Sequence, residues 1–248
     1  MSYGDLSEEA VEKHQEAGQI LVEVMNEARE MVEPGATHLE VAESAEEHIV
    51  ELGGEPAFPV NVSIDNEASH ATPEADDETV FGEDDMVCLD VGVHVDGYIA
   101  DAAVTVDFSE SDELVEAAEQ ALDAALDEVE AGAEVGVVGQ AIEDVIDGYG
   151  YSPVLNLSGH GLQRYDAHTG PTIPNRGVDR SAELEAGQVV AIEPFATDGS
   201  GKVNEGTHEQ IFELQQERSV RDRAARQAME QITSEFDGLP FAERWLDT

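Results

Sequence analysis

The sequence has one cysteine, two lysines and no long hydrophobic run. The single cysteine, Cys88, excludes an internal disulfide bond and a cysteine-rich zinc site. We expect its thiol to point away from the Asp90 face and to lie in the core as a small apolar group. No apolar segment approaches the roughly 18 residues of a membrane-spanning helix, and the acidic N-terminus lacks a signal-peptide pattern. The sequence therefore predicts a cytoplasmic protein.

Positive charge is also scarce, because 11 lysines and arginines face 57 aspartates and glutamates, giving a formal net charge of −46. A surface this acidic repels phosphate groups, so we expect neither nucleic acid nor a membrane as a partner. Disorder is excluded by composition, since Val, Leu, Ile and Phe make up about 24% of the chain, above the ~20% typical of disordered sequences. An evenly acidic, lysine-poor surface suggests a halophilic protein, whose self-repulsion is screened by concentrated salt. An acidic protein from an ordinary environment is the alternative.

Four segments have the apolar spacing of amphipathic helices. Their apolar positions recur every three or four residues within 17–32, 39–49, 114–129 and 138–145. The second segment opens with a capping box formed by Thr37 and Glu40. The expected stop signals are Pro34–Gly35, Gly53–Gly54 and Gly148.

Strands are expected between and after these helix pairs. Residues 86–95 and 98–106 alternate as two strands joined by Asp96–Gly97, a dipeptide that favours a tight antiparallel hairpin. The apolar run 188–195 reads as another strand. After about Glu213 the sequence becomes rich in arginine, and we expect a separate helical element there.

An internal repeat runs through the chain. Four motifs recur in the same order: 32–36 as 129–133, 59–63 as 154–158, 70–73 as 168–171, and 86–90 as 189–193. Each match alone is weak, but four matches in the same order predict two similar α/β halves related by a pseudo-two-fold axis.

Asp90 and Asp101 lie on the two strands of the expected hairpin. With Asp96–Gly97 as the turn, both fall on one face as diagonal neighbours, roughly 7–8 Å apart at the backbone. Their flanking residues are all Leu, Val or Ala, and two carboxylates in an apolar setting require a cation or a raised pKa. The pattern favours a pair of divalent ions, although solvated sheet residues are an alternative in so acidic a chain.

Glu193 takes in the second half the position that Asp90 holds in the first. It lies in an apolar run, where a single glutamate is rarely a surface residue. Pro194 limits strand pairing, as expected at a sheet edge or at the mouth of a site. A core glutamate paired with an arginine is the alternative interpretation.

Three histidines have informative surroundings. Glycines flank His160, which would let the backbone pass close to a ligand. His70 and His168 are repeat partners and are expected to face each other across the axis. Each of the three could instead be structural. We interpret the remaining histidines as structural or solvated: His14, His38, His48, His94 and His208.

These candidates form a donor set of carboxylates with one imidazole. Such a set suits Mn, Fe(II) or Co, with Zn possible, and does not suit a thiolate-type structural zinc site. Two adjacent ions can polarise a carbonyl and clamp the attacking and leaving groups. The sequence therefore predicts hydrolysis, with histidines outside the metal shell that steady the tetrahedral intermediate.

Together the motifs resemble type 2 methionine aminopeptidases of the archaeal kind. The resemblance rests on residues 56–61, 70–73, 158–160 and 191–195, together with the Asp90 and Asp101 pair and His168. It covers nearly the whole chain from about residue 5. It implies the pita-bread fold, an α+β fold in which two α/β halves surround a curved, mainly antiparallel sheet. Residues 1–212 would form the catalytic domain, with halves of about 1–107 and 108–212, and residues 213–248 the start of the type 2 helical insert.

The resemblance also implies roles for individual residues. Two divalent ions (Co, Mn, Fe or Zn) would be bound by Asp90, Asp101, His160 and Glu193. The catalytic histidines would be His70, which positions the substrate and assists proton transfer, and His168, which contacts the scissile peptide. Phe58 would help to form the methionine pocket.

The implied reaction is removal of the initiator methionine when the next residue is small. The partners would be N-terminal methionyl peptides and nascent polypeptides, and we expect a monomer. The family pattern has a fifth ligand, a glutamate on a strand near the C-terminus, for which this chain offers no candidate. No returning strand is expected after Glu193 either, so we expect a C-terminally incomplete chain that binds metal weakly.

Two other functions compete with this one. A non-catalytic pita-bread module that binds peptides or proteins would lack several ligands, whereas this chain keeps four ligands and both histidines. An X-Pro-type peptidase would carry an additional N-terminal domain, whereas only about 55 residues precede Pro56.

Overall fold

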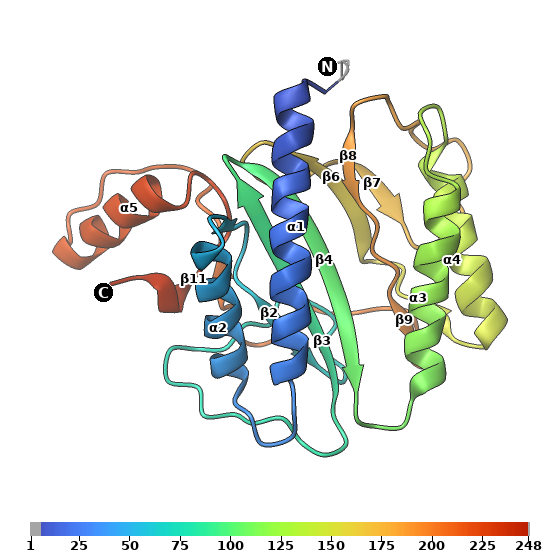
Figure 1. Ribbon diagram of the computed structural model, residues 1–248, viewed down its shortest axis with the longest axis horizontal. Helices are drawn as coiled ribbons and strands as arrows, with labels where there is room; N and C mark the ends of the chain where they lie inside the picture. The colour runs from blue at the N-terminus through green and yellow to red at the C-terminus, as the bar shows by residue number, and fades with distance from the viewer. Residues whose placement is uncertain (1–5, 248) are drawn as a thin grey trace. The chain divides into compact units, whose positions relative to one another are not determined.

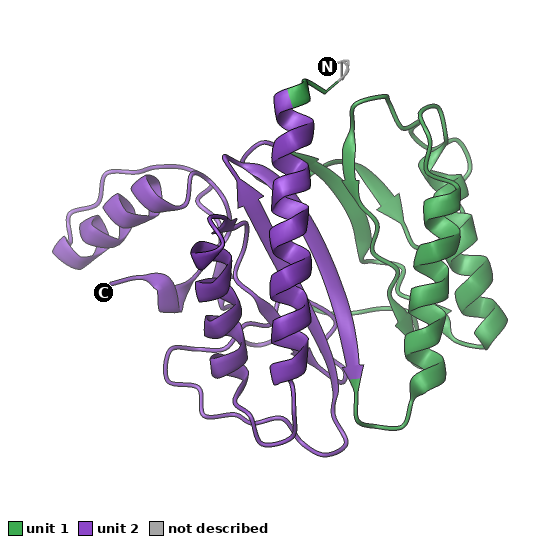
Figure 2. Ribbon diagram, viewed as in Figure 1, with its two compact units in different colours: residues 1–8, 107–163, 168–205 green, residues 9–106, 164–167, 206–248 purple. Residues whose placement is uncertain are grey.

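The computed structural model describes residues 6–247, which form two compact units (Figure 2). Within the described residues, unit 1 consists of residues 6–8, 107–163 and 168–205, and unit 2 of residues 9–106, 164–167 and 206–247. Each unit combines helices with antiparallel strands (Figure 1). The predicted α+β fold class is therefore confirmed.

Two helices open unit 2, α1 (Glu8–Met31) and α2 (His38–Glu51). The backbone N–H of Glu40 donates to Thr37 Oγ1 at 3.1 Å, which is the first half of the predicted capping box. The Glu40 carboxylate accepts from the Thr37 hydroxyl at 3.2 Å. Both helices end before the predicted Pro34–Gly35 and Gly53–Gly54 signals, which confirms these helix ends.

The sheet of unit 2 has the order β1-β3-β2, with β4 also paired to β3. Its strands are β1 (Glu55–Pro56), β2 (Asn61–Ile64), β3 (Met86–Val95) and β4 (Tyr98–Asp107). Asp96 and Gly97 both have positive φ, 53° and 83°, as a type I′ turn requires. The predicted hairpin is therefore confirmed.

The apolar face of β3 is covered by the two helices (Figure 1). Val87, Leu89, Val91 and Val93 are completely buried. A Cβ placed on Gly54 would lie 3.0 Å from Val93, 3.2 Å from Ile20 of α1 and 3.3 Å from Ile49 of α2, so these elements meet there without spare room. Asp90 lies on the opposite face of β3, so its carboxylate points away from this apolar core.

The prediction for Cys88 is wrong. Residues two apart on a strand share a face, so Cys88 lies on the same face of β3 as Asp90. It is half-buried and forms no disulfide bond. Cys88 was predicted to lie in the core because its neighbours in the sequence are apolar, although side chains alternate between the two faces of a strand.

Unit 1 contains the helices α3 (Asp112–Asp127) and α4 (Val135–Tyr149). Ala121, Ala125, Val138, Ile142 and Ile146 form the centre of its core. The C-cap of α4 is Gly150, whose φ of 86° is left-handed, so this helix runs past the predicted stop at Gly148.

The strands of the second sheet system, which lie mainly in unit 1, range from two to nine residues in length. They are β5 (Ser152–Pro153), β6 (Ser158–Gln163), β7 (Asp166–Pro174), β8 (Val189–Ala191) and β9 (Ala196–Thr197). The sheet has the order β7-β6-β8, and β5 pairs with β9.

The strand predicted for 188–195 ends earlier than expected, at Ala191, and Glu193 lies in the link to β9. Pro194 has no N–H to donate, and the Phe195 carbonyl accepts instead from Val154 N at 2.8 Å. The chain therefore turns away from β6 after Ala191. A short strand, β9, follows Glu193, but it pairs with β5 and not with β8, so it is not a return strand of the kind that carries Asp101 after Asp90.

The segment after residue 206 belongs to unit 2. It contains β10 (Ile211–Phe212), α5 (Arg223–Glu235), β11 (Phe241–Ala242) and the 3₁₀ turn η1 (Glu243–Trp245). Asp222 caps α5 by accepting from Ala225 N at 3.1 Å. The helix predicted after Glu213 is thus present, and the chain then returns to pack its end against the rest of unit 2.

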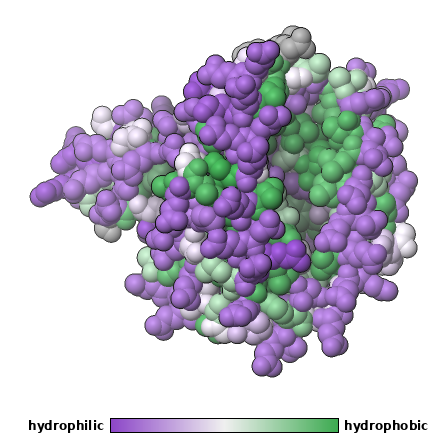
Figure 3. Space-filling model, in the orientation of Figure 1, coloured by the Kyte–Doolittle hydropathy of each residue, from purple (hydrophilic) through white to green (hydrophobic). Residues whose placement is uncertain are grey.

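Hydrophilic side chains cover most of the outward surfaces of α1 and α5 (Figure 3). This fits the excess of acidic residues over basic ones in the sequence. Within residues 6–247, none of the helices combines the length and the apolar character needed to cross a bilayer.

Candidate metal centre

Asp90 is held in place by a neighbouring strand. Asn61 of β2 lies directly opposite Asp90 of β3 in the register of the sheet. Its amide Nδ2 donates to Asp90 Oδ2 at 2.8 Å, and Asn61 itself is only 2% exposed. A carboxylate oriented by a buried amide donor keeps its remaining lone pairs in a fixed direction, which is how ligating carboxylates are commonly supported.

Asp101 lies in the adjacent strand β4 and is half-buried. Beside Asp90 on the same face of β3, Gly92 has no side chain, and the Phe58 ring fills that space. A Cβ on Gly92 would lie 2.2 Å from Phe58 Cε1. Phe58, which is 6% exposed, is therefore seated directly on the strand that carries Asp90.

His70 lies in the loop that follows β2. It is exposed, and its φ of 59° is in the left-handed region that a non-glycine residue seldom adopts. The next residues are fixed, because Val62 N donates to the Ala71 carbonyl at 2.7 Å. His70 therefore projects from a strained position at the end of an anchored segment, an arrangement that recurs at functional sites.

Unit 1 brings His160 and Glu193 together. His160 lies in β6, opposite Ala191 of β8, and Glu193 follows two residues later. His160 Nε2 lies 3.1 Å from Glu193 Oε1, and the two side chains are 12% and 30% exposed. An imidazole and a carboxylate that meet this closely, with a partly open side, can share a cation.

The glycines around His160 have a different role from the predicted one. A Cβ on Gly159 would lie 2.3 Å from the Ala191 carbonyl oxygen, and a Cβ on Gly161 would lie 2.2 Å from the Gly170 carbonyl oxygen. The close approach that demands glycine is therefore to the backbones of β8 and β7. No ligand is needed to explain these two glycines.

His168 of β7 lies next to His160. The two ring centroids are 4.5 Å apart with an angle of 47° between the planes. His168 is exposed, whereas the side chains of His160 and Glu193 are 12% and 30% exposed. It can reach a bound molecule without being a member of that pair.

Among residues 6–247, the side chains Asp101, His160 and Glu193 make up a candidate metal-binding group. Each is half-buried and offers one carboxylate or imidazole atom. Two oxygen donors and one nitrogen donor fit a first-row divalent ion. Asp90, the fourth predicted ligand, is not a member of this group, but its carboxylate is oriented by Asn61 as a ligand would be.

Asn61 was not predicted as a site residue from the sequence. It lies within the motif 56–61, but its role becomes visible only from its position opposite Asp90. That position depends on the register of β2 on β3, which the sequence does not give. The interpretation of His94 as structural is confirmed. Gly97 N donates to its Nδ1 at 3.2 Å, and burial lowers the pKa of its imidazole.

Unit 2 also contains a cavity of about 550 Å³. Its walls include Glu46, Val50, His94, Phe236 and Trp245. None of the predicted ligands, catalytic histidines or pocket residues lines it, so the cavity is separate from the candidate site residues of unit 2.

The chain is similar to known peptidases over most of its length. The profile of metallopeptidase family M24 matches residues 12–231. The methionine aminopeptidase of Archaeoglobus fulgidus is 50% identical over 241 residues, which is 97% of this chain and 83% of that protein. That of Methanocaldococcus jannaschii is 47% identical over 239 residues, or 96% of this chain and 81% of that protein.

Solved structures agree with this similarity. The crystal structure of a methionine aminopeptidase from Thermotoga maritima matches with a TM-score of 0.77 and 29% sequence identity. The match covers 83% of this chain and 86% of that one.

Proposed function

The chain belongs to metallopeptidase family M24, and we propose that it is a methionine aminopeptidase that removes the initiator methionine from nascent proteins. The observation that carries this function is the 50% identity to a methionine aminopeptidase across 97% of the chain. Membership of the family also confirms the predicted pita-bread fold. A small second residue in the substrate is part of the proposal.

The proposed metal ligands are Asp90, Asp101, His160 and Glu193, which would hold two divalent ions. The mixed oxygen and nitrogen donors suit Co, Mn, Fe(II) or Zn. When bound, these ions would supply a Lewis acid for the scissile carbonyl and lower the pKa of water. Asn61 supports the site by fixing the direction of the Asp90 carboxylate.

The proposed substrate contacts are His70, His168 and Phe58. His70 is exposed and held at a positive φ, so its imidazole can meet the substrate and carry a proton to or from it. His168 is exposed beside His160 and would contact the scissile peptide. Phe58 presents an apolar ring against β3, which suits an unbranched thioether side chain.

Three peptides test this function against its alternatives. Metal-loaded protein is expected to release methionine from Met-Ala-Ser, and to leave N-acetyl-Met-Ala-Ser intact because an aminopeptidase needs a free N-terminus. Cleavage of Ala-Pro-Ser in preference to Met-Ala-Ser would identify an X-Pro-type peptidase. Binding of Met-Ala-Ser without release of methionine would identify a non-catalytic peptide-binding module.

The place of action follows from the proposed substrate. Nascent chains emerge where translation occurs, so the proposal places the protein in the cytoplasm. That it acts as a monomer is a separate part of the proposal. The formal net charge of −46 supports the further proposal that this cytoplasm is salt-rich, because concentrated salt screens repulsion among surface carboxylates.

The proposed halophilic character predicts that salt stabilises the fold. Lowering the ionic strength from about 1 M to 0.01 M lengthens the screening distance from roughly 3 Å to 30 Å, so that scattered acidic residues repel one another across the surface. Thermal melts followed by circular dichroism are expected to shift upward steadily as KCl is raised through this range. A melting temperature that does not change with KCl would contradict the prediction.

A further inference from the structure

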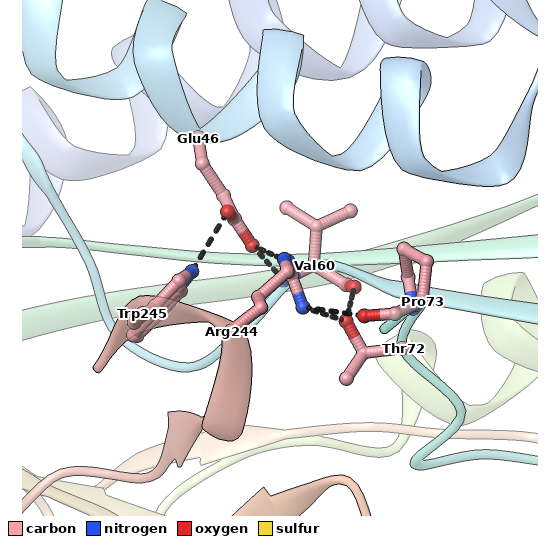
Figure 4. Close-up of polar contacts among 6 residues, drawn as sticks. All are labelled: Glu46, Val60, Thr72, Pro73, Arg244 and Trp245. Carbon is pink, nitrogen blue, oxygen red and sulfur yellow. Dashed lines mark hydrogen bonds and ion pairs between the residues drawn. The ribbon is translucent and has the colours of Figure 1, made fainter. Parts of the chain in front are cut away.

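A buried polar network joins the end of the chain to α2 and to the loop after β2 (Figure 4). At its centre, the Glu46 carboxylate accepts three hydrogen bonds. Val60 N donates to Oε1 at 3.1 Å, Trp245 Nε1 donates to Oε2 at 2.9 Å, and Arg244 Nη2 donates to Oε1. One carboxylate therefore connects segments that lie about 200 residues apart in the sequence.

The other arm of the Arg244 guanidinium reaches the loop. Arg244 Nη1 donates to Thr72 Oγ1 at 2.6 Å and to the Pro73 carbonyl at 3.2 Å. Thr72 Oγ1 in turn donates to the Val60 carbonyl at 2.8 Å. The network is thus a closed ring, in which Val60 is held through its N–H by Glu46 and through its carbonyl by Thr72.

Both charges in this network are removed from water. The side chains of Arg244 and Glu46 are 2% and 11% exposed. Burial lowers the pKa of the Arg244 guanidinium, and burial raises the pKa of the Glu46 carboxyl while Arg244 opposes that rise. Among the described residues, Arg244 Nε is buried without a hydrogen-bond partner.

Such a buried ion pair is expected to add little to the free energy of unfolding by itself. Desolvation of two buried charges commonly cancels their attraction, and an apolar pair of similar size often serves equally well. An unsatisfied buried donor adds a further penalty. What an apolar pair could not supply is the fixed two-armed geometry of the guanidinium, which holds Glu46 on one side and the Thr72–Pro73 backbone on the other.

The two segments held by this ring carry candidate site residues. Thr72 follows His70 by two residues, and Ala71 between them is bound to Val62 N. Val60 is preceded by Phe58 two residues earlier and followed directly by Asn61, which orients Asp90. The ring therefore lies behind the loop of His70 and behind the segment that presents Phe58 and Asn61.

We propose that Arg244 is a positioning residue, whose guanidinium, seated on Glu46, fixes the loop at Thr72 and Pro73 and thereby sets the position of His70 against the substrate. The inference rests on the proposed function for the role of His70. It adds Arg244, whose guanidinium contacts Glu46, Thr72 and Pro73 within residues 6–247 and none of the proposed metal ligands there.

Two variants test the two sets of contacts that the Arg244 guanidinium makes, one with Thr72 and one with Glu46. Thr72→Val keeps the size of the side chain and the Arg244–Glu46 pair but removes the hydroxyl that links Arg244 to Val60. Arg244→Lys keeps a positive charge beside Glu46 but loses the planar fork. Arg226→Lys is the matched control, because Arg226 is exposed on α5 and its side chain, within residues 6–247, donates to the nearby Arg221 carbonyl.

Methionine release from Met-Ala-Ser supplies the first readout. Thr72→Val and Arg244→Lys are expected to lower kcat roughly 10-fold to 100-fold, the range for a misplaced catalytic group. KM is expected to change much less, and bound metal not at all. Arg226→Lys is expected to match the wild type. Because Arg244→Lys perturbs a buried pair, its melting temperature is measured first, and Thr72→Val decides the question if that variant does not fold.

The imidazole signal of His70 in NMR spectra is the second readout, identified by its absence from the spectrum of His70→Ala. Both variants are expected to shift this signal, and Arg226→Lys to leave it unchanged. This readout needs no turnover. A wild type that releases no methionine would overturn the proposed function, while a shifted His70 signal would still support the positioning role. Folded variants with wild-type kcat and an unchanged His70 signal would overturn the inference.

Discussion

Asp101→Asn is expected to abolish methionine release and to leave the fold intact. Asparagine has the shape of aspartate but no charge, so it cannot supply the charged oxygen that Asp101 is proposed to contribute to the metal site. Loss of the ion removes both the Lewis acid and the activated water, which are worth several kcal/mol. At 1.36 kcal/mol for each tenfold change in rate, the loss should reach at least roughly 10³-fold.

Asp96→Asn is the matched control for Asp101→Asn. Asp96 belongs to the turn of the same hairpin, is exposed, and pairs with Lys13 at 3.1 Å. Asparagine is well suited to its positive φ, so the turn should persist. The control removes the same charge from the same hairpin, and its activity and metal content should equal those of the wild type.

Metal content by mass spectrometry, circular dichroism and methionine release decide this prediction. Asp101→Asn should lose bound metal and activity together while keeping the wild-type spectrum. Near-wild-type turnover of Asp101→Asn in the presence of added Mn or Co would remove Asp101 from the set of ligands.

His70→Ala is expected to lower kcat by roughly 10²-fold to 10⁴-fold, the range for a lost general acid–base group. The metal content should remain unchanged, because His70 lies outside the proposed ligand set. His208→Ala is the control, since His208 is also exposed and lies in unit 2. Its turnover should equal that of the wild type.

The comparison of metal content with kcat tests the role of His70. If His70→Ala loses metal, His70 is a ligand and the division between ligands and proton-transfer groups is wrong. If His70→Ala keeps both its metal and its turnover, His70 has no part in the reaction.

Local signals in the sequence predicted much of the fold. Asp96–Gly97 forced a turn with two positive φ values, and Thr37 with Glu40 marked the start of α2, because both signals act within a few residues. The prediction of a strand through Glu193 was wrong, because the Phe195 carbonyl accepts a hydrogen bond from Val154 N. Val154 lies in a distant segment, so the sequence around Glu193 gives no sign of this contact.

The candidate site was less completely predictable. The carboxylates and histidines were found because their residue types stand out in an apolar or glycine-rich context. Asn61 was missed because only the register of β2 on β3 places it opposite Asp90. Arg244 was missed because its partner Glu46 lies in a helix near the other end of the chain, and no spacing in the sequence connects them.

The central claim is metal-dependent release of N-terminal methionine, and one titration tests it most directly. Protein stripped with EDTA is held in excess over Met-Ala-Ser, Mn or Co is added stepwise, and free methionine is measured by mass spectrometry. The account predicts no release without metal and release that rises until about two ions per chain are bound, with none at any step for Asp101→Asn. Release that is insensitive to EDTA, or absent after saturation with every one of Mn, Co, Fe(II) and Zn, would contradict the account.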